Sequence, residues 1–291
     1  LDIPTGEILA VASRPSFDPE RLEQDWDRLR VDSDAPLVER GTQGLYPPGS
    51  TFKILTMAGA LADGRTSVEE SFHCAGSLDA GHFILQDNAT HGQVTLSQAL
   101  VVSCNVTFGT LGLRLGSAGL ARWMEAFGML ASPPLVPGAA ASLPARGQAP
   151  SVGAEAGIGQ ADMLVSPLAM ARLTATLARG GLDLEPRLVR AATHAGQVVW
   201  RPEPAPSTRV VPEEVARGIR EAMVAVVRTG TGQAAAVPGV QVAGKTGTAE
   251  NPQGRPHAWF VGFAPAEDPR VAVVLVLENA GGGGSHAAPL A

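Results

Sequence analysis

The most strongly apolar helical segment of the chain comprises residues 51–62. Apolar side chains occupy nearly all of its positions rather than one face, which is typical of a helix buried on every side. Pro47, Pro48 and Gly49 interrupt the chain directly before it, so Ser50 is expected at the N-terminus of this helix. Further helical patterns lie at residues 95–103, 105–115, 117–127, 166–179 and 212–228.

The pattern near the C-terminus is that of strands. Residues 240–243, 258–263 and 271–277 are β-branched or aromatic runs separated by turn residues, and they predict three consecutive antiparallel strands. Residues 1–13 are expected to form two short strands around a turn at Gly6. Strands at both ends of the chain indicate an α+β fold, in which helices flank a central antiparallel sheet.

Domain organisation follows from the same pattern. Residues 131–153 are rich in Pro, Ala, Gly and Ser, and they are expected to form a long surface loop. The sequence shows neither an internal repeat nor a clear linker. We therefore expect one domain over residues 1–291, with a helical insert at about 50–180 that forms an all-helical subdomain.

Composition narrows the range of functions. Of the 291 residues 45% are apolar and 17% are charged, so the chain can bury a sizeable core. Its formal net charge is -6, which argues against a general nucleic-acid binder and against a polybasic membrane anchor. No apolar run reaches the roughly 18 residues of a membrane span. We expect no nucleic-acid partner and no membrane contact from this part of the chain.

The basic residues are unusual in kind. Of 22 basic side chains only two are lysines, Lys53 and Lys245, and the others are arginines. Arginine stays protonated in proteins, whereas burial readily lowers the pKa of a lysine, so that its amine can act as a base. Base composition of the gene could leave two lysines by chance, but the sequences around them favour a function.

Ser50 and Lys53 form a Ser-x-x-Lys motif, and residues three apart lie on one face of a helix. The hydroxyl of Ser50 is a weak nucleophile until a neighbouring base takes its proton, and Lys53 is the candidate base. A free lysine has a pKa near 10.4, so an amine that is neutral near pH 7 requires a decrease of about 3 units. Taken alone, the motif is more often an N-cap serine followed by a surface lysine.

The second lysine begins the motif Lys245-Thr246-Gly247-Thr248, at the end of the first predicted C-terminal strand. Because Gly247 has no side chain, another backbone can approach it closely. The hydroxyls of Thr246 and Thr248 are candidate ligands of a substrate carboxylate. An exposed lysine at a strand end is the simpler alternative.

A third motif, Ser103-Cys104-Asn105, lies between two predicted helices. There Ser103 can pass a proton to a leaving amine and Asn105 can bind a substrate amide, although helix capping is common for both residue types. Ser-x-x-Lys, Ser-x-Asn and Lys-Thr-Gly in this order are parts of one signature of serine β-lactamases and penicillin-binding proteins.

The signature and its flanks resemble the transpeptidase domain of penicillin-binding proteins, over nearly the whole chain. Residues 46–53 are similar to the family's nucleophile segment, and residues 157–160 and 166–171 resemble the region of a later helix. Residues 257–265 and the glycine run at 281–285 are similar to monofunctional, class B members. The resemblance implies a penicillin-binding and serine β-lactamase-like fold.

The resemblance implies acyl transfer on the bacterial cell wall. Ser50 would attack the carbonyl between the two terminal D-alanines of a peptidoglycan stem peptide, and Lys53 would accept its proton. Backbone N–H groups of Ser50 and Thr248 would form the oxyanion hole. An amine of a neighbouring strand would then complete the cross-link, and β-lactam antibiotics would acylate the same serine. The candidate catalytic residues are Ser50, Lys53, Ser103 and Lys245, and the candidate substrate-binding residues are Asn105, Thr246, Gly247 and Thr248.

The family also implies a location and partners. Its class B members carry a membrane anchor and a non-catalytic pedestal domain, and neither is expected within residues 1–291. Action is therefore expected at the outer face of a bacterial plasma membrane, in the periplasm or the cell-wall space. A membrane-anchored full-length protein with cell-wall synthesis partners is expected there.

No cofactor and no metal are expected. The histidines show no ligand spacing, and Asp87 and His91 are expected to be turn residues. Cys104 is expected to be a buried packing thiol, and a disulfide between Cys74 and Cys104 is a less favoured alternative.

Three other functions share part of the signature. A serine β-lactamase would need a group that activates water; Glu155 lies in the corresponding region, but its flanks do not resemble that loop. A D,D-carboxypeptidase would use water in place of the acceptor amine, and a β-lactam sensor domain would be acylated once and signal. The class B-like segment at 257–265 favours the transpeptidase.

Overall fold

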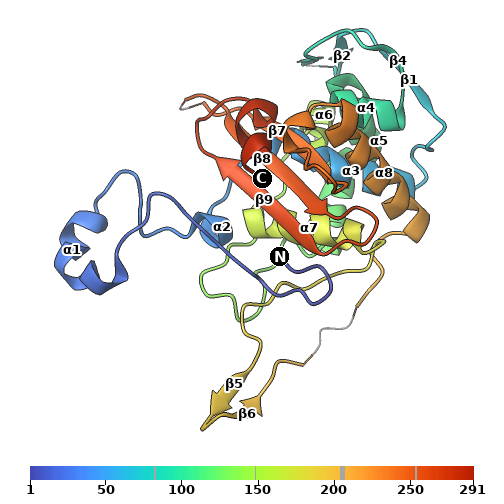
Figure 1. The fold of residues 1–291 in the computed structure, drawn as a ribbon. Coiled ribbons are helices and arrows are strands. Elements are labelled where there is room, and N and C mark those ends of the chain that lie inside the picture. The colour runs from blue at the N-terminus through green and yellow to red at the C-terminus, as the bar shows by residue number, and fades with distance from the viewer. Residues whose placement is uncertain (82, 148, 204–206, 253) are drawn as a thin grey trace.

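A three-stranded antiparallel sheet lies near the centre of the molecule (Figure 1). The structure is a computed structural model that describes residues 1–81, 83–147, 149–203, 207–252 and 254–291. The sheet has the order β7 (Ala243–Ala249), β8 (His257–Ala264) and β9 (Val271–Leu277). The α+β fold and the three consecutive antiparallel strands predicted from the sequence are therefore confirmed.

The first of these strands was placed too early in the chain. It was expected at residues 240–243, but β7 begins at Ala243 and continues to Ala249, paired with β8 from Ala243↔Phe263 to Ala249↔His257. Lys245 therefore lies inside a strand. The Lys-Thr-Gly-Thr run lacks the apolar alternation of a typical strand because its polar side chains are used in a cleft, as described below.

Helices cover the sheet. β8 has six consecutive buried residues, so both of its faces are covered. The helix α7 (Pro167–Ala178) packs against β8 and β9, and α8 (Glu213–Thr229) packs against β7. Ser166 caps α7 by accepting a hydrogen bond from the N–H of Ala169, at 3.2 Å, which confirms the predicted helix start.

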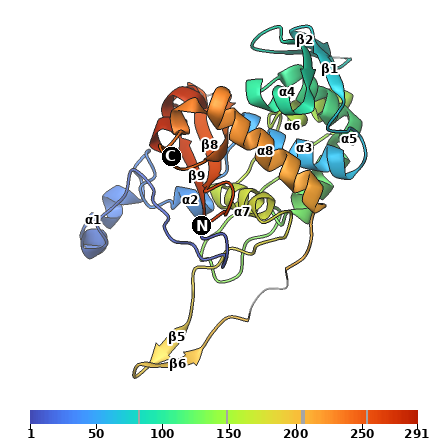
Figure 2. The ribbon, with the colours of Figure 1, turned by 45° about the vertical axis from the view of Figure 1, so that its right-hand side comes forward.

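A group of helices lies beside the sheet (Figure 2). Its central helix, α3 (Lys53–Ala62), is buried at eight consecutive positions, as its apolar pattern predicted. The long helix α5 (Asn105–Ala126) packs against α3 and breaks at Gly116, where φ is 68°, between the two predicted helical segments. Two further helices complete the group: α4 (Leu96–Val102) and α6 (Pro150–Gly157).

Short strands accompany these helices. Two antiparallel pairs, β1 with β4 and β2 with β3, lie at the outer end of the helical group in both views (Figures 1 and 2). Their bounds are β1 (Ser71–Cys74), β2 (Ser77–Asp79), β3 (Ile84–Gln86) and β4 (Gly92–Thr95). β3 also borders the cleft described below, because three of its residues line that cleft.

The N-terminal segment does not form the two predicted strands. Its backbone pairs with other elements instead: Asp2 forms a single bridge with Val271, and Glu7 forms one with Arg187. The predicted turn is present, because Gly6 has a φ of 78° and its N–H donates to the carbonyl of Asp2 at 2.9 Å.

The predicted loop at 131–153 also needs correction, apart from residue 148, which lies outside the described residues. It ends in α6, whose first residue is Pro150. It is also partly buried, because Val136 and Ser142 are 7% and 2% exposed and Leu143 pairs with Leu164. A Pro-, Gly- and Ala-rich composition therefore did not distinguish a surface loop from one that packs against the core.

Two small units extend from the body (Figures 1 and 2): α1 (Leu22–Leu29) and the hairpin of β5 (Ala192–His194) with β6 (Gln197–Trp200). The remaining short elements are η1 (Pro19–Arg21), α2 (Arg40–Gln43), η2 (Gly49–Phe52), η3 (Gln233–Ala235), η4 (Gly283–Ala287) and η5 (Ala288–Leu290). Within the described residues, none of the helices is both long enough and apolar enough to span a membrane.

Candidate active site

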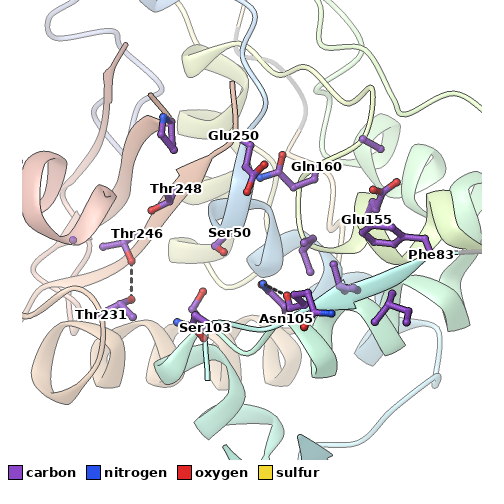
Figure 3. Close-up of a pocket in the computed structure, with 18 residues that line it drawn as sticks. Ser50, Phe83, Ser103, Asn105, Glu155, Gln160, Thr231, Thr246, Thr248 and Glu250 are labelled. Carbon is purple, nitrogen blue, oxygen red and sulfur yellow. Dashed lines mark hydrogen bonds between the residues drawn. The ribbon is translucent and has the colours of Figure 1, made fainter. Parts of the chain in front are cut away.

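A cleft of about 850 Å³ lies between β7 and the helical group (Figure 3). Five residues of the three sequence motifs line it: Ser50, Ser103, Asn105, Thr246 and Thr248. The two lysines of the motifs are fully buried behind this lining. The fold thus brings together three motifs that lie about 50 to 190 residues apart in the sequence.

Ser50 lies on the short helix η2, here called the Ser50 turn, directly before α3. The N–H of Gly49 donates to the carbonyl of Gly159 at 2.9 Å, which ties this turn to the segment after α6. On the other side, a Cβ atom at Gly247 would lie 2.9 Å from the carbonyl oxygen of Pro48. The close backbone approach predicted at Gly247 is therefore present, and it positions the Ser50 turn against β7.

Lys53 is fully buried, and its amine bonds to the turn between α4 and α5. Nζ donates to the carbonyl of Ser103 at 2.6 Å, to Oδ1 of Asn105 at 2.7 Å and to Oγ of Ser103 at 3.2 Å. Burial lowers the pKa of Lys53 to about 7, against the opposing charges of Asp87 and Cys104. Lys53 therefore has the pKa expected of a base that works near neutral pH.

The relation between Lys53 and Ser50 was a further expectation. The amine of Lys53 was expected to meet the hydroxyl of Ser50, since the two residues are three positions apart. Among the hydrogen bonds of the described residues, however, its partners are Ser103 and Asn105. The described contacts thus show the amine of Lys53 bonded to the Ser103 turn, and its meeting with the hydroxyl of Ser50 stays a prediction.

Lys245 reaches the same serine from the sheet. Its amine donates to Oγ of Ser103 at 2.9 Å and to the carbonyl of Thr246 at 2.9 Å. Burial, and then the nearby charge of Lys53, hold the pKa of Lys245 well below its usual range. The hydroxyl of Ser103 is thus held between two buried amines, an arrangement that can move a proton.

The backbone explains how Ser103 and Asn105 face the cleft. Ser103 ends α4 in the left-handed conformation, with a φ of 61°, and Asn105 begins α5 two residues later. The side-chain amide of Asn105 accepts from Lys53 and donates to the carbonyl of Gln86 on β3, at 3.0 Å. Asn105 therefore links the buried lysine to the wall of the cleft.

The two threonines of the Lys-Thr-Gly-Thr run make further contacts. The hydroxyls of Thr246 and Thr231 are 2.6 Å apart (Figure 3), and the hydroxyl of Thr248 accepts from the N–H of Gly283 at 3.3 Å. A Cβ atom at Gly283 would lie 2.2 Å from the carbonyl oxygen of Gly247, so the glycine run packs directly on the sheet. This confirms that the run is a folded part of the domain.

Several residues of the cleft were not found from the sequence. Thr231, Phe83, Gln160 and Glu250 line it but belong to none of the three motifs (Figure 3). Glu155, which was weighed as a water-activating group, lines it as well. Gln160 belongs to the family-like segment at 157–160, but no local pattern marks Thr231, Phe83 or Glu250 as residues of the cleft.

A second cluster lies behind the Ser103 turn and includes Asp87 and His91, which lie in the loop between β3 and β4. Potential ligand atoms of Cys74, Asp87, His91 and Cys104 all lie within 4.8 Å of one another. Both cysteines are free, so the alternative disulfide is not formed. Two thiols, an imidazole and a carboxylate are ligands that Zn²⁺ takes in proteins, and these four residues could hold such an ion. The spacing did not reveal the set because its members come from β1, the loop before β4 and the start of α5.

The comparison with known families agrees with this geometry. The whole chain, residues 1–291, matches the family model described as the penicillin binding protein transpeptidase domain. The chain belongs to this family.

The transpeptidase domain has similar relatives among curated proteins. It is 36% identical over 318 residues to peptidoglycan D,D-transpeptidase PbpA of Mycolicibacterium smegmatis, covering 100% of this chain and 64% of that protein. It is 34% identical over 332 residues to peptidoglycan D,D-transpeptidase MrdA of Acinetobacter baumannii, covering 99% of this chain and 48% of that protein. The chain thus spans at most about two thirds of the length of these relatives. They are class B penicillin-binding proteins, as the sequence resemblance predicted.

Solved structures are equally similar. A ceftriaxone acyl-enzyme complex of penicillin-binding protein A from M. tuberculosis has a TM-score of 0.91 and 35% identity, covering 100% of this chain and 71% of that chain. The D,D-transpeptidase domain of a peptidoglycan glycosyltransferase from Eggerthella lenta has a TM-score of 0.91 and 33% identity, covering 100% of this chain and 75% of that chain. The penicillin-binding fold expected from the sequence is thereby confirmed.

Proposed function

We propose that this domain is a serine-type D,D-transpeptidase that cross-links peptidoglycan stem peptides through an acyl-enzyme on Ser50. β-Lactam antibiotics acylate the same hydroxyl. The observation that carries this proposal is the hydroxyl of Ser103, held between the amines of Lys53 and Lys245 on the wall of the cleft that Ser50 also lines. The proposed nucleophile and proton relay thus line one cleft, and the proposed base lies directly behind it.

The acylation step begins with a proton transfer. The oxygen of Ser50 forms a bond to the carbonyl carbon between the two terminal D-alanines, and its proton passes to the neutral amine of Lys53. About half of this amine is neutral at pH 7, because its pKa is about 7. Its bonds to the Ser103 turn are those of the resting site, and contacts of catalytic groups often form only when substrate is bound.

The tetrahedral intermediate then collapses. Its oxyanion accepts hydrogen bonds from the backbone N–H groups of Ser50 and Thr248, each typically worth roughly 3 to 4 kcal/mol. The C–N bond to the terminal D-alanine breaks, and the leaving nitrogen takes a proton from the hydroxyl of Ser103. Ser103 recovers this proton from Lys53, which returns the amine to its neutral form.

The acceptor amine completes the reaction. It attacks the ester carbonyl on Ser50, loses a proton through the same relay and releases the serine as the new peptide bond forms. Asn105 binds a peptide amide of the substrate, Gly247 allows the close backbone contact, and the hydroxyls of Thr246 and Thr248 bind the terminal carboxylate. No step of this sequence requires a cofactor.

The setting of the reaction is also a proposal. We infer that residues 1–291 form one transpeptidase domain with a helical insert at about 50–180, within a longer membrane-anchored protein. Its substrates place it at the outer face of a bacterial plasma membrane, where cell-wall synthesis partners supply the peptidoglycan strands. The support is the likeness to relatives that are themselves longer than this chain.

The experiment is intact-mass analysis of the purified chain with benzylpenicillin, with Ser50→Ala as the control. A persistent adduct of one penicillin on the wild-type protein, absent from Ser50→Ala, is expected. A transient adduct with accumulating hydrolysed drug would favour a serine β-lactamase instead. Release of D-alanine from a stem peptide without cross-linking in the presence of acceptor would favour a D,D-carboxypeptidase. Acylation by benzylpenicillin without turnover of the stem peptide, in the presence or absence of acceptor, would favour a sensor domain.

A further inference from the structure

The charge of the cleft is one-sided. Among the described residues that line it, only two are ionisable, Glu155 and Glu250, and both are acidic. The two lysines of the site are buried behind the lining and interact with Ser103. A substrate that enters the cleft therefore meets carboxylates and hydroxyls but no exposed cation from this lining.

Backbone packing fixes the position of Glu155. It lies on α6, which contacts α5 so closely that a Cβ atom at Gly112 would lie 2.2 Å from the carbonyl oxygen of Gly153. The carbonyl of Glu155 accepts hydrogen bonds from the N–H of Ile158 at 3.1 Å and of Gln160 at 2.9 Å. This segment is also the one that packs against the Ser50 turn, so Glu155 and the reacting serine are rigidly related.

An aromatic side chain lines the same end of the cleft as this carboxylate. Figure 3 shows Phe83 and Glu155 at the same end of the cleft, away from Thr246 and Thr248. Phe83 is 38% exposed, so part of its ring is accessible to a ligand in the cleft. A carboxylate together with the face of an aromatic ring is a typical binding site for an ammonium group.

We propose that Glu155 and Phe83 form a subsite for a primary ammonium group of the stem peptides, and that they determine specificity in the transpeptidation proposed above, on which this inference rests. Stem peptides are the appropriate class because a donor peptide carries the counterpart of the amine that reacts on the acceptor, and on the donor this amine does not react. The ammonium belongs either to the donor peptide or to the acceptor peptide, and the chemistry of recognition is the same.

The electrostatic surroundings of Glu155 support this role. Burial, and then the charge of Asp162, raise the pKa of its carboxyl. The described hydrogen bonds and ion pairs include none to its carboxylate that would offset this cost. A bound ammonium would supply the missing opposite charge.

The donor arm of the test uses two penicillins with the same side chain, one ending in a primary ammonium and the other acetylated at that nitrogen. The readout is the ratio of their second-order rate constants for acylation of Ser50. We expect the wild-type protein to prefer the cationic penicillin about fivefold, which corresponds to about 1 kcal/mol. Glu155→Gln should bring the ratio within about twofold of one, and Phe83→Leu should reduce it.

The acceptor arm uses a thioester donor and two amine acceptors, with and without a second ammonium group. The readout is the partition of the acyl-enzyme between aminolysis and hydrolysis. If Glu155→Gln loses the preference for the cationic compound in only one of the two arms, that arm identifies the peptide that carries the recognised ammonium. Glu125→Gln removes an exposed carboxylate of α5 outside the cleft and should keep the wild-type ratio in both arms.

The outcomes separate this inference from the proposed function. Unchanged ratios in Glu155→Gln in both arms, or a ratio that falls in Glu250→Gln instead, would overturn the subsite. If neither penicillin acylates Ser50, the proposed function fails. In that case the subsite is tested by binding to the Ser50→Ala protein, with a lysine-containing D-Ala-D-Ala peptide and its acetylated form. The subsite predicts a lower dissociation constant for the peptide with the free ammonium, and Glu155→Gln should abolish this difference.

Discussion

The burial of Lys53 makes the pH dependence of acylation a direct test of the mechanism. Burial lowers the pKa of this amine from 10.5 to about 7, a decrease that corresponds to about 5 kcal/mol against its charged form. If the neutral amine is the base, the acylation rate follows its neutral fraction. The rate should reach a plateau above about pH 8, and it should fall to about one tenth of the plateau at pH 6 and to about one hundredth at pH 5.

The assay is the second-order rate constant for acylation by benzylpenicillin, measured by intact mass from pH 5 to pH 9. The carboxylate of the drug stays ionised over this range, so the protein supplies the titrating group. Circular dichroism at each pH should show that the protein remains folded. A rate that is independent of pH over this range, or one that still rises tenfold per unit above pH 8, would refute the assignment of Lys53 as the base.

Two variants serve as controls for this test. Lys53→Arg keeps a positive charge that cannot be lost near neutral pH, so acylation should fall by roughly a thousandfold or more at every pH. Because a guanidinium is larger than an amine and could disturb a buried site, Lys53→Met provides a second variant of similar length without a base. A folded Lys53→Met protein that is acylated at the wild-type rate would exclude the proposed role.

Three further predictions concern stability. Lys53→Met should raise the thermal midpoint, as differential scanning calorimetry would show. The gain in the free energy of unfolding should be about 3 kcal/mol larger at pH 6 than at pH 9. The sign follows because the unfolded wild-type chain binds more protons than the folded protein between about pH 7 and 10.5, so wild-type stability rises with pH in that window. A gain from Lys53→Met of similar size at both pH values would be inconsistent with a buried amine. Gly159→Ala should lower the free energy of unfolding in urea by about 3 kcal/mol or more. The reason is that Gly159 has a φ of 77° and that a Cβ atom there would lie 2.1 Å from the carbonyl oxygen of Gly49. Wild-type stability of this variant would contradict the packing described. Tyr46→Phe should cost about 1 to 2 kcal/mol in the same assay, because the hydroxyl of Tyr46 donates to Glu278 at 2.6 Å, and a neutral effect would show that the bond adds nothing.

The helices and the chemistry were largely predictable from the sequence because both are recorded locally. The uninterrupted apolar run of α3 predicted a buried helix, and the paired Ser166 and Pro167 predicted the start of α7. The lysine-poor composition drew attention to Lys53 and Lys245, and their flanking residues led to the three motifs. These signals depend on residues within a few positions of one another.

Local signals failed where polar residues have a tertiary role. The strand β7 was placed too early because its Lys-Thr-Gly-Thr run carries the polar side chains of the cleft. The cluster of Cys74, Asp87, His91 and Cys104 was missed because its ligand spacing exists only after β1, the loop before β4 and α5 pack together.

The sequence by itself thus determined the fold class, the three motifs and the type of reaction that they favour, because residue chemistry and short-range periodicity carry that information. Only the tertiary structure decided how these groups meet. It placed the hydroxyl of Ser103 between two amines that come from residues 192 positions apart, and it set Glu155 and Phe83 on one side of the cleft. These contacts depend on backbone packing between distant segments, such as the contact of Gly159 with the Ser50 turn, and no local pattern records such packing.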